Sequence, residues 1–212
     1  MYTPPHFRED DVALLHETIR RIAFGTLVTL GPDGLVASHV PMLLDADKGE
    51  RGTLTGHLAK ANIQTRTEAT EIEALAIFQG PEAYITPNWY ATKQEHGKVV
   101  PTWNYVAVHT YGPISFFEDE ERLREQVSRL TDRHEAANSE PWALNDAPEK
   151  FVRGQLKGII GFEIPITRMD GKWKLSQNRP AADKEGVIRG LEARDGEDTP
   201  ITAETRQTLR SS

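Results

Sequence analysis

Residues 98–111 read KVVPTWNYVAVHTY, the longest run of strand-forming residues in the chain. β-Branched and aromatic side chains favour a pleated strand. Pro101 requires an edge or a bulge near the start, because proline has no N–H to donate. Successive side chains of a strand point to opposite faces, which puts Trp103 and Tyr105 on one face and Asn104 on the other. The segment predicts one long strand, around which the other segments can be arranged.

Other strands are predicted on both sides of this one. Gly31-Pro32-Asp33-Gly34 is strong turn chemistry between two apolar runs and predicts a β-hairpin. A second hairpin is expected across Met169-Asp170-Gly171, and Gly80-Pro81 is expected to break a strand. The strand segments are 25–30, 35–44, 53–58, 74–79, 83–85, 158–168 and 172–177. Hairpins without regular βαβ alternation predict an α+β barrel and not a Rossmann fold.

Helical periodicity is found between the strands and after them. Asp10 or Asp11 can cap a first helix, and acidic residues crowd the start of the clearest helix, as its dipole prefers. The expected helices are 11–22, 119–134, 149–155 and 183–194, with a short helix or loop over 59–70. We expect one domain over residues 1–194 and a flexible C-terminal tail over 195–212, which is charged and rich in threonine.

Composition restricts the possible functions. The 212 residues carry a formal net charge of −7, which opposes DNA binding unless a local basic patch overrides it. Cysteine is absent, which excludes thiolate chemistry and fits a cytoplasmic location. No apolar run reaches the length of about 20 residues that a membrane span needs. There is no GxGxxG or Walker A motif, and no HxH or HExxH spacing, so we expect no metal site.

The segment 55–62 predicts an anion site. It is a strand end that turns into an expected helix start, where free N–H groups and Lys60 can hold a phosphate. An ordinary turn with a solvated lysine remains the alternative. In the preceding hairpin, Ser38 and Val40 share one face of a strand and His39 lies on the other. One of these faces can line a ligand groove, or His39 can be an ordinary strand histidine.

Two further segments can contact a flat ligand. Trp103 and Tyr105 can stack on a ring while Asn104 pairs with a polar ring edge, although core packing is the commoner use of such residues. Residues 172–179, KWKLSQNR, gather several hydrogen-bond donors at a strand end. A solvated edge strand protected by lysines is the alternative for this segment.

Five motifs in order resemble one family. They are MYTPPHF at 1–7, ASHVPM at 37–42, GHLAKAN at 56–62, VPTWNYVAVHTYG at 100–112 and GKWKLSQNR at 171–179. This series is similar to the PaiB-type FMN-binding negative transcriptional regulators, from residue 1 to about residue 191. The resemblance implies a mostly antiparallel split β-barrel of the FMN-binding type with peripheral helices. It also implies a homodimer with FMN at the subunit interface.

The resemblance also implies which residues bind the flavin. The turn from His57 to Lys60, with Asn62 nearby, matches the phosphate site, and the strand from Ser38 to Val40 matches the wall beside the ribityl chain or ring edge. The strand containing Trp103 and the end containing Lys174 would approach the flavin, from the partner subunit. The implied cofactor-binding residues are Ser38, His39, Val40, His57, Leu58, Ala59, Lys60, Asn62, Trp103, Asn104, Tyr105, Lys174 and Gln177. Fewer cations face the phosphate than in pyridoxamine-phosphate oxidases, which implies modest FMN affinity.

Three functions remain open from the sequence. The first is a flavin-binding regulator or sensor of the PaiB type, and the second is a flavin-dependent oxidoreductase or haem-handling enzyme that acts on a small molecule. The third is a dimer whose flavin site has decayed. Arginines on the helix 119–134 alternate with acidic residues, which indicates a solvated face and not a DNA-recognition helix. No catalytic residue can be assigned.

Overall fold

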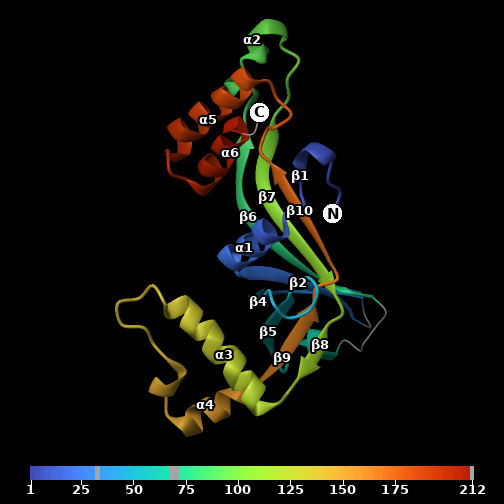
Figure 1. Ribbon diagram of the computed structural model, residues 1–212, viewed down its shortest axis with the longest axis vertical. Coiled ribbons are helices and arrows are strands. Elements are labelled where there is room, and N and C mark those ends of the chain that lie inside the picture. The colour runs from blue at the N-terminus through green and yellow to red at the C-terminus, as the bar shows by residue number, and fades with distance from the viewer. Residues whose placement is uncertain (32–33, 67–71, 211–212) are drawn as a thin grey trace. The chain divides into compact units, whose positions relative to one another are not determined.

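The computed structural model describes residues 1–31, 34–66 and 72–210 (Figure 1). The chain divides into two compact units where the sequence predicts one domain. Unit 1 comprises Met1–Asp11, Gln79–Val108 and Asp170–Ser212, and unit 2 comprises Val12–Phe78 and His109–Met169. Within the described residues, none of the helices combines the length and the apolar character needed to cross a membrane.

Unit 2 contains two sets of antiparallel strands. The first pairs β2 with β3 and with the beginning of β6, and the second has the order β4-β5-β9-β8. The predicted first hairpin is confirmed as β2 and β3, although Pro32 and Asp33 of its turn lie outside the described residues. The bounds are β2 Phe24–Gly31, β3 Gly34–Pro41, β4 Leu43–Asp45, β5 Thr53–Ala59, β6 Ala74–Ile85, β8 Ser115–Phe117 and β9 Ile159–Pro165.

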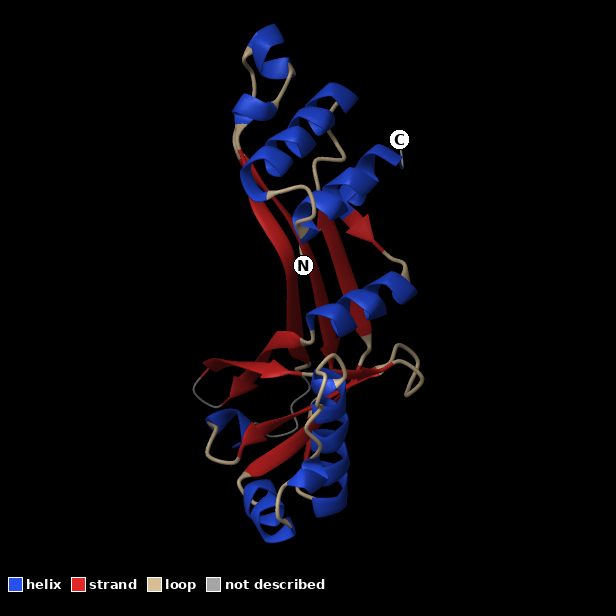
Figure 2. Ribbon diagram, turned by 90° about the vertical axis from the view of Figure 1, so that its left-hand side faces the viewer, coloured by secondary structure: helices blue, strands red, loops and turns tan. Residues whose placement is uncertain are grey.

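Helices pack against these strands through apolar faces. In α1, Val12–Ile22, the buried Leu15 and Ile19 stand four residues apart, as one helical face requires. α3, Glu120–Glu135, begins at the predicted place because Asp119 Oδ1 accepts a hydrogen bond from the N–H of Arg122 at 2.9 Å. α3 and α4, Glu149–Leu156, share a small apolar cluster with the short 3₁₀ helix η4, Leu144–Asp146. Figure 2 distinguishes the helices of the chain, in blue, from its strands, in red.

Unit 1 is built on the strands β1, β10, β7 and β6, which are hydrogen-bonded in that order. Its bounds are η1 Pro5–Phe7, β1 Arg8–Glu9, η3 Pro87–Trp89, α2 Thr92–His96, β7 Thr102–Gly112, β10 Arg168–Lys174, α5 Ala181–Asp195 and α6 Pro200–Arg210. β6 and β7 contribute residues to both units. β7 begins directly after Pro101, so the proline precedes the ladder and costs it no hydrogen bond.

Two strand predictions are wrong. β6 continues through Gly80-Pro81 without a break. The pairing of β6 with β2 ends at Ile77. Pro81 lies beyond the paired residues, so its missing N–H leaves no carbonyl group of β2 without a donor. β9 and β10 do not form a hairpin. β9 pairs with β5 and β8, β10 pairs with β1, and Met169-Asp170-Gly171 lies inside β10 with Gly171 opposite Glu9.

Residues 200–210 form α6 where the sequence predicts a loose tail. Its buried face is made of Ile201 and of threonines, which do not give an obvious apolar pattern. The hydroxyl of Thr205 donates to the carbonyl of Ile201 at 2.8 Å, so a polar side chain is satisfied inside the helix. Glu204 accepts a buried hydrogen bond from Trp173 Nε1 at 3.3 Å, which ties α6 to β10.

The packing of α5 depends on glycine. A Cβ on Gly186 would meet the carbonyl oxygen of Trp89. We therefore expect Gly186→Ala to destabilise the protein by about 1–3 kcal/mol through overpacking. Gly154→Ala is the matched control, because Gly154 is also helical and an added Cβ there meets nothing within 4 Å. This control should be neutral or stabilising by up to about 1 kcal/mol. Urea unfolding of both variants measures the difference, and equal stabilities would contradict the packing.

Candidate functional site

The residues predicted to bind flavin fall into two groups. One group, which runs from Ser38 to Asn62 in sequence, belongs to unit 2. The other group belongs to unit 1 and contains Trp103, Asn104, Tyr105, Lys174 and Gln177. Asn104 and Lys174 of the second group line a cavity of unit 1, whereas the residues of the first group do not line the cavity of unit 2.

In unit 2, Asn62 joins the turn after β5 to Ser38 on β3. Its Nδ2 donates to Ser38 Oγ at 2.8 Å, and its Oδ1 accepts from the backbone N–H of Gln64 at 2.9 Å. Gln64 is fully buried and donates through Nε2 to the carbonyls of Leu27 and Val36 at 3.1 and 3.3 Å. These contacts bring Ser38 and Asn62 together, as the resemblance implies.

The turn after β5 leads into a short helix, as expected for residues 59–70. Within the described residues this helix is η2, Ile63–Arg66, a 3₁₀ helix of four residues. Asn62 caps it by accepting the N–H of Gln64. A 3₁₀ helix of four residues contributes little dipole, so the predicted anion site depends on Lys60. Lys60 supplies the positive charge at this turn, and its Nζ lies 2.6 Å from Glu118 Oε2.

The two histidines of this group face different neighbours. His57 Nδ1 lies 2.8 Å from Gln126 Oε1, so this histidine faces α3. His39 is exposed, with Nδ1 3.0 Å from Thr26 Oγ1 and its ring stacked on Phe24. Ser38 and Val40 share the opposite, more buried face of β3, which confirms the predicted alternation. Leu58 is buried and Ala59 exposed, so these two contribute backbone more than side chain to the turn.

Beside His57, unit 2 holds a cavity of about 340 Å³. Acidic and basic side chains both line this cavity. Glu163 Oε1 lies 2.8 Å from Lys48 Nζ and 2.9 Å from Arg122 Nη2. Burial would raise the pKa of Glu163, but the hydrogen bonds from these two cations outweigh burial and lower the pKa. The lining residues are Asp45, Lys48, Thr55, Phe117, Arg122, Glu125, Gln126, Arg129 and Glu163.

In unit 1, the strand β7 presents its residues as predicted. Trp103 is 51% exposed and meets Tyr84 edge to face, with ring centroids 5.9 Å apart. Tyr105 lies 5.3 Å from the ammonium of Lys172. On the other face, Asn104 is fully buried, and its Oδ1 accepts a hydrogen bond from Ser176 Oγ at 3.1 Å. The aromatic face is therefore accessible, and the amide lies inside.

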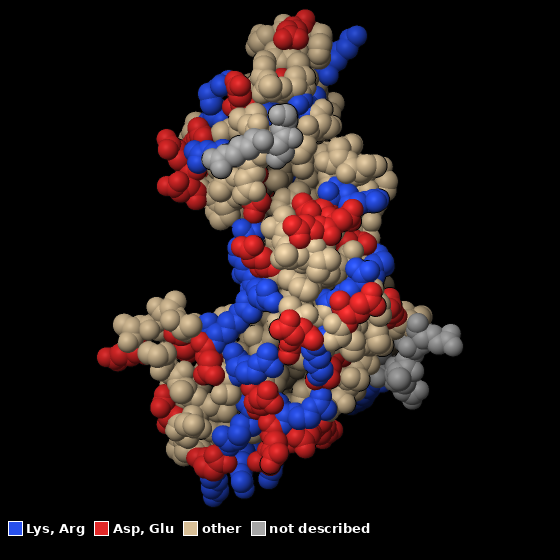
Figure 3. Space-filling model, in the orientation of Figure 1, with Lys and Arg blue, Asp and Glu red and all other residues tan. Residues whose placement is uncertain are grey.

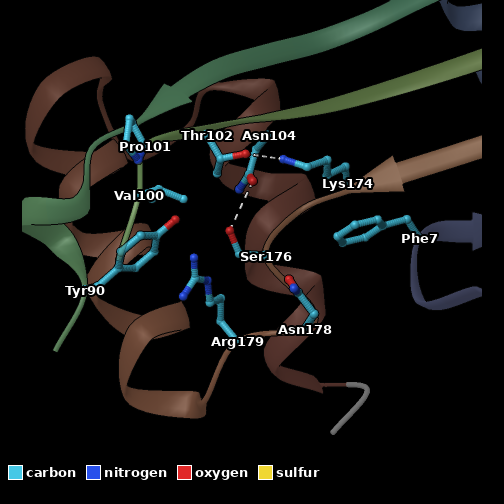
Figure 4. Close-up of a pocket in the computed structure, with 10 residues that line it drawn as sticks. All are labelled: Phe7, Tyr90, Val100, Pro101, Thr102, Asn104, Lys174, Ser176, Asn178 and Arg179. Carbon is cyan, nitrogen blue, oxygen red and sulfur yellow. Dashed lines mark hydrogen bonds between the residues drawn. The ribbon is translucent and has the colours of Figure 1, made fainter. Parts of the chain in front are cut away.

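A second cavity, of about 170 Å³, lies in unit 1 (Figure 4). Lys174 and Arg179 are the cations among the ten residues that line it. Burial lowers the pKa of Lys174, and the nearby charges of Lys172 and Arg179 lower it further. The ten lining residues are Phe7, Tyr90, Val100, Pro101, Thr102, Asn104, Lys174, Ser176, Asn178 and Arg179.

Sequence reasoning missed several residues of this cavity. Tyr90 and Phe7 were assigned no role, and Arg179 appeared only as one donor in a polar strand end. Gln177 was predicted to bind flavin, but its side chain is engaged locally, with Oε1 accepting from the N–H of Leu175 and Nε2 donating to the carbonyl of Trp173. The sequence does contain a signal for Phe7 and Arg179. Phe7 ends the motif at 1–7 and Arg179 ends the motif at 171–179, and residues of both motifs line the cavity.

Known proteins resemble this chain in sequence over most of its length. Residues 1–168 match the family described as "Putative FMN-binding domain". The chain is 36% identical over 193 residues to "Protease synthase and sporulation protein PAI 2" of Bacillus subtilis, covering 91% of this chain and 89% of that protein.

Solved structures share the fold. The flavocytochrome Anf3 from Azotobacter vinelandii is similar with a TM-score of 0.59 and 10% identity, over 79% of this chain and 69% of that one. The FAD and heme binding protein from Mycobacterium smegmatis has a TM-score of 0.57 and 14% identity, over 79% and 73%. At such low identity the likeness concerns the fold alone. It agrees with the predicted α+β class, a mostly antiparallel split barrel with peripheral helices whose sheets are open.

The contacts of Glu163 predict a pH dependence of stability. A carboxylate with a lowered folded-state pKa stabilises above its unfolded-state pKa, and this contribution is lost as the pH falls through the folded-state pKa. We expect the unfolding free energy of the wild type to fall more steeply than that of Glu163→Gln in the acid range below the ordinary glutamate value of 4.5. Urea titrations at a series of pH values measure this, with the exposed Glu140→Gln as control. Identical profiles for wild type and Glu163→Gln would contradict the ion pairs.

Proposed function

The chain belongs to the FMN-binding domain family that matches its residues 1–168, and from this premise we propose that it works as a PaiB-like, homodimeric FMN-binding protein. The family match is the observation that carries the proposal, and the accessible aromatic face of β7 supports it. When bound, FMN supplies redox chemistry, while the residues of this chain bind and orient it. We assign the activity to the cytoplasm, because a chain without cysteine suits a reducing compartment.

We assign the FMN phosphate to the turn after β5. Lys60 is 41% exposed in its side chain and can turn toward a ligand, and Asn62 and Ser38 are already joined beside it. The ion pair with Glu118 opposes this role, because the carboxylate competes with the phosphate for one ammonium group. A single contested cation supports modest affinity for FMN.

The flavin ring needs flat surfaces that the cavities do not offer. The cavity of about 170 Å³ in unit 1 is smaller than the range of about 300–1,000 Å³ typical of drug-sized ligands. The cavity of about 340 Å³ in unit 2 contains Asp45, Glu125 and Glu163, which would repel a phosphate. Trp103 and Tyr84 form an exposed aromatic pair, a surface on which a ring or a second protein chain can pack.

A second copy of the chain therefore belongs to the proposal. Phe24 and Leu35 on the β2–β3 hairpin are 59% and 79% exposed, in addition to the aromatic pair of unit 1. Phe24 and Leu35 lie at opposite ends of the hairpin, so the aromatic pair of Trp103 and Tyr84 is the exposed apolar contact that supports an interaction surface. We propose that Trp103 of one copy lies in the dimer interface, where the flavin of the other copy is bound.

Regulation by direct DNA contact is disfavoured. On α3, Arg122, Arg124 and Arg129 are each ion-paired with a glutamate, so they are compensated before any phosphate arrives. On the face shown in Figure 3, basic and acidic side chains are interspersed. Together with the net charge of −7, this supports an indirect route for any regulatory effect on transcription.

FMN titration of the apoprotein tests the phosphate assignment. We expect Lys60→Ala to weaken the binding free energy by about 1.5–3 kcal/mol, the value of a charge-assisted hydrogen bond. Glu118→Gln is the matched variant and should strengthen binding, because it frees Lys60. Flavin absorption and fluorescence report the bound fraction. Lys60→Ala with unchanged affinity would remove Lys60 from the site, and a protein that binds no FMN would overturn the proposed function.

Sedimentation velocity tests the dimer. We expect wild type to sediment as a homodimer and Trp103→Asp as a monomer, because an unpaired charge buried in an interface costs several kcal/mol. Trp142→Asp is the control, since Trp142 is similarly exposed at 45% but lies in a loop of unit 2. A dimeric Trp103→Asp would exclude this tryptophan from the interface, and a monomeric wild type would overturn the homodimer.

A further inference from the structure

The small cavity of unit 1 is built from segments that are distant in sequence. Phe7 comes from the N-terminal arm and Tyr90 follows η3. Residues 100–104 span the approach to β7 and its start, and residues 174–179 run from the end of β10 into the loop after it. Tyr90, Asn104 and Ser176 form a buried floor, with exposed fractions of 2%, 0% and 4%. The exposed residues of the lining, 100, 101 and 178, form the open side.

The floor contains polar atoms that have no partner within the described protein. Asn104 Nδ2 and Tyr90 Oη are buried and make no hydrogen bond of normal geometry. Leaving a buried donor unsatisfied costs about 1–3 kcal/mol, so such groups require a reason. Burial raises the pKa of Tyr90 above its usual value of 10.0, so the phenol keeps its proton and can donate. A ligand that accepts hydrogen bonds would satisfy both groups.

The charge of the cavity is positive. None of the described residues that line it is acidic, whereas Lys174 and Arg179 are both basic. The nearby carboxylate of Asp183 is already engaged, because its two oxygens accept from the N–H and the hydroxyl of Thr92 at 2.9 and 2.8 Å. Lys172 adds a third cation close by, and it donates to the carbonyl of Tyr2 at 3.1 Å. The field in the cavity therefore favours an anion.

Arg179 is poised to recognise a planar anion. Its guanidinium lies over the ring of Tyr90, 4.4 Å from the ring centroid, and Figure 4 shows it extending toward Tyr90. Arg179 forms no ion pair with a carboxylate within the described residues, and its guanidinium interacts with the ring and the hydroxyl of Tyr90. A fixed guanidinium plane suits two parallel hydrogen bonds to a carboxylate.

The loop that holds this arrangement is strained. Ser176 has φ = 69°, a left-handed conformation that costs a residue other than glycine about 1–3 kcal/mol. In this conformation its hydroxyl donates to Asn104 Oδ1 at 3.1 Å, which occupies that oxygen and leaves the Nδ2 donor as the free end of the amide. Strain that persists in order to orient a buried donor is typical of a binding site.

We propose that this cavity binds a small organic carboxylate with a short apolar body. Its charged end would meet Arg179, Lys174 and the free donors of Asn104 and Tyr90, and its body would contact Phe7, Val100 and Pro101. A volume of about 170 Å³ is too small for a flavin ring and suits a compact molecule. The cavity shares Lys174 and Asn104 with the residues predicted to approach flavin, but the proposal does not depend on FMN binding. Four of its residues, 174, 176, 178 and 179, lie beyond the segment matched by the family.

Isothermal titration calorimetry of the full chain tests the proposal, with benzoate, butyrate and inorganic phosphate as probes. Benzamide is the neutral match for benzoate, because it keeps the ring and removes the charge. We expect benzoate or butyrate to bind, benzamide to bind at least tenfold more weakly, and Arg179→Gln to lower carboxylate affinity at least tenfold. Arg189→Gln is the matched control, since it removes an exposed arginine of the same unit. It should leave carboxylate affinity unchanged.

Competition experiments with FMN and riboflavin distinguish the proposed carboxylate site from the flavin site. We expect FMN affinity to be equal in wild type and Arg179→Gln, and saturating FMN to leave benzoate binding intact. Displacement of benzoate by FMN but not by riboflavin would assign the cavity to the cofactor phosphate and overturn the proposal. Binding of phosphate alone, or of none of the probes, would also overturn it. If Arg179→Gln does not fold, the Tm of the wild type is measured with benzoate and with benzamide. A Tm raised by benzoate and not by benzamide supports the carboxylate site, and the same Tm with both compounds contradicts it.

Discussion

The buried hydrogen bond from Ser176 to Asn104 determines the architecture of unit 1 around its cavity. It joins the end of β10 to the start of β7 over 3.1 Å, and it holds Ser176 in a conformation that the residue would otherwise avoid. Because Asn104 and Ser176 are buried, losing this contact would leave two polar groups without their hydrogen bond. The orientation of Arg179, three residues further along, follows from the path that this hydrogen bond imposes on the loop.

Unit 2 uses buried amides in a related way. Asn62 and Gln64 fasten the turn after β5 to the β2–β3 hairpin through side-chain hydrogen bonds. Strand ends that would otherwise be free loops are thereby fixed at defined positions. The proposed phosphate contact Lys60 lies directly beside this network, so the same amides that stabilise the turn also position the cation.

The two units differ in how their charges are compensated. In unit 2 the cations around the larger cavity and on α3 are paired with carboxylates, which leaves little net field for an anion. In unit 1 Lys174 and Arg179 gather without an acidic neighbour in the cavity lining. The depressed pKa of Lys174 reflects this concentration of charge together with burial. These two electrostatic environments support the proposal of two sites with different ligands.

Local pattern was sufficient for most elements and for some contacts of the site. The alternation of residues 38–40, the helix predicted over 119–134 and the strand containing Trp103 follow from the periodicity of the side chains, so the sequence predicted them. Motif order was also sufficient to indicate the FMN-binding family and the split-barrel fold. These features depend on residues only a few positions apart, where the stereochemistry of the backbone leaves few choices.

Tertiary structure alone decided the remaining features. β9 and β10 join different strand sets although an Asp-Gly turn signal stands near their junction, and α6 buries threonines that read as a loose tail. The cavity that gathers Phe7, Tyr90 and Arg179 draws on four segments of the chain. Which strand pairs with which, and which polar side chain finds a partner, depends on contacts between residues far apart in the chain. No local period encodes those contacts, because they are set by packing and by hydrogen bonds that exist only once the chain has folded.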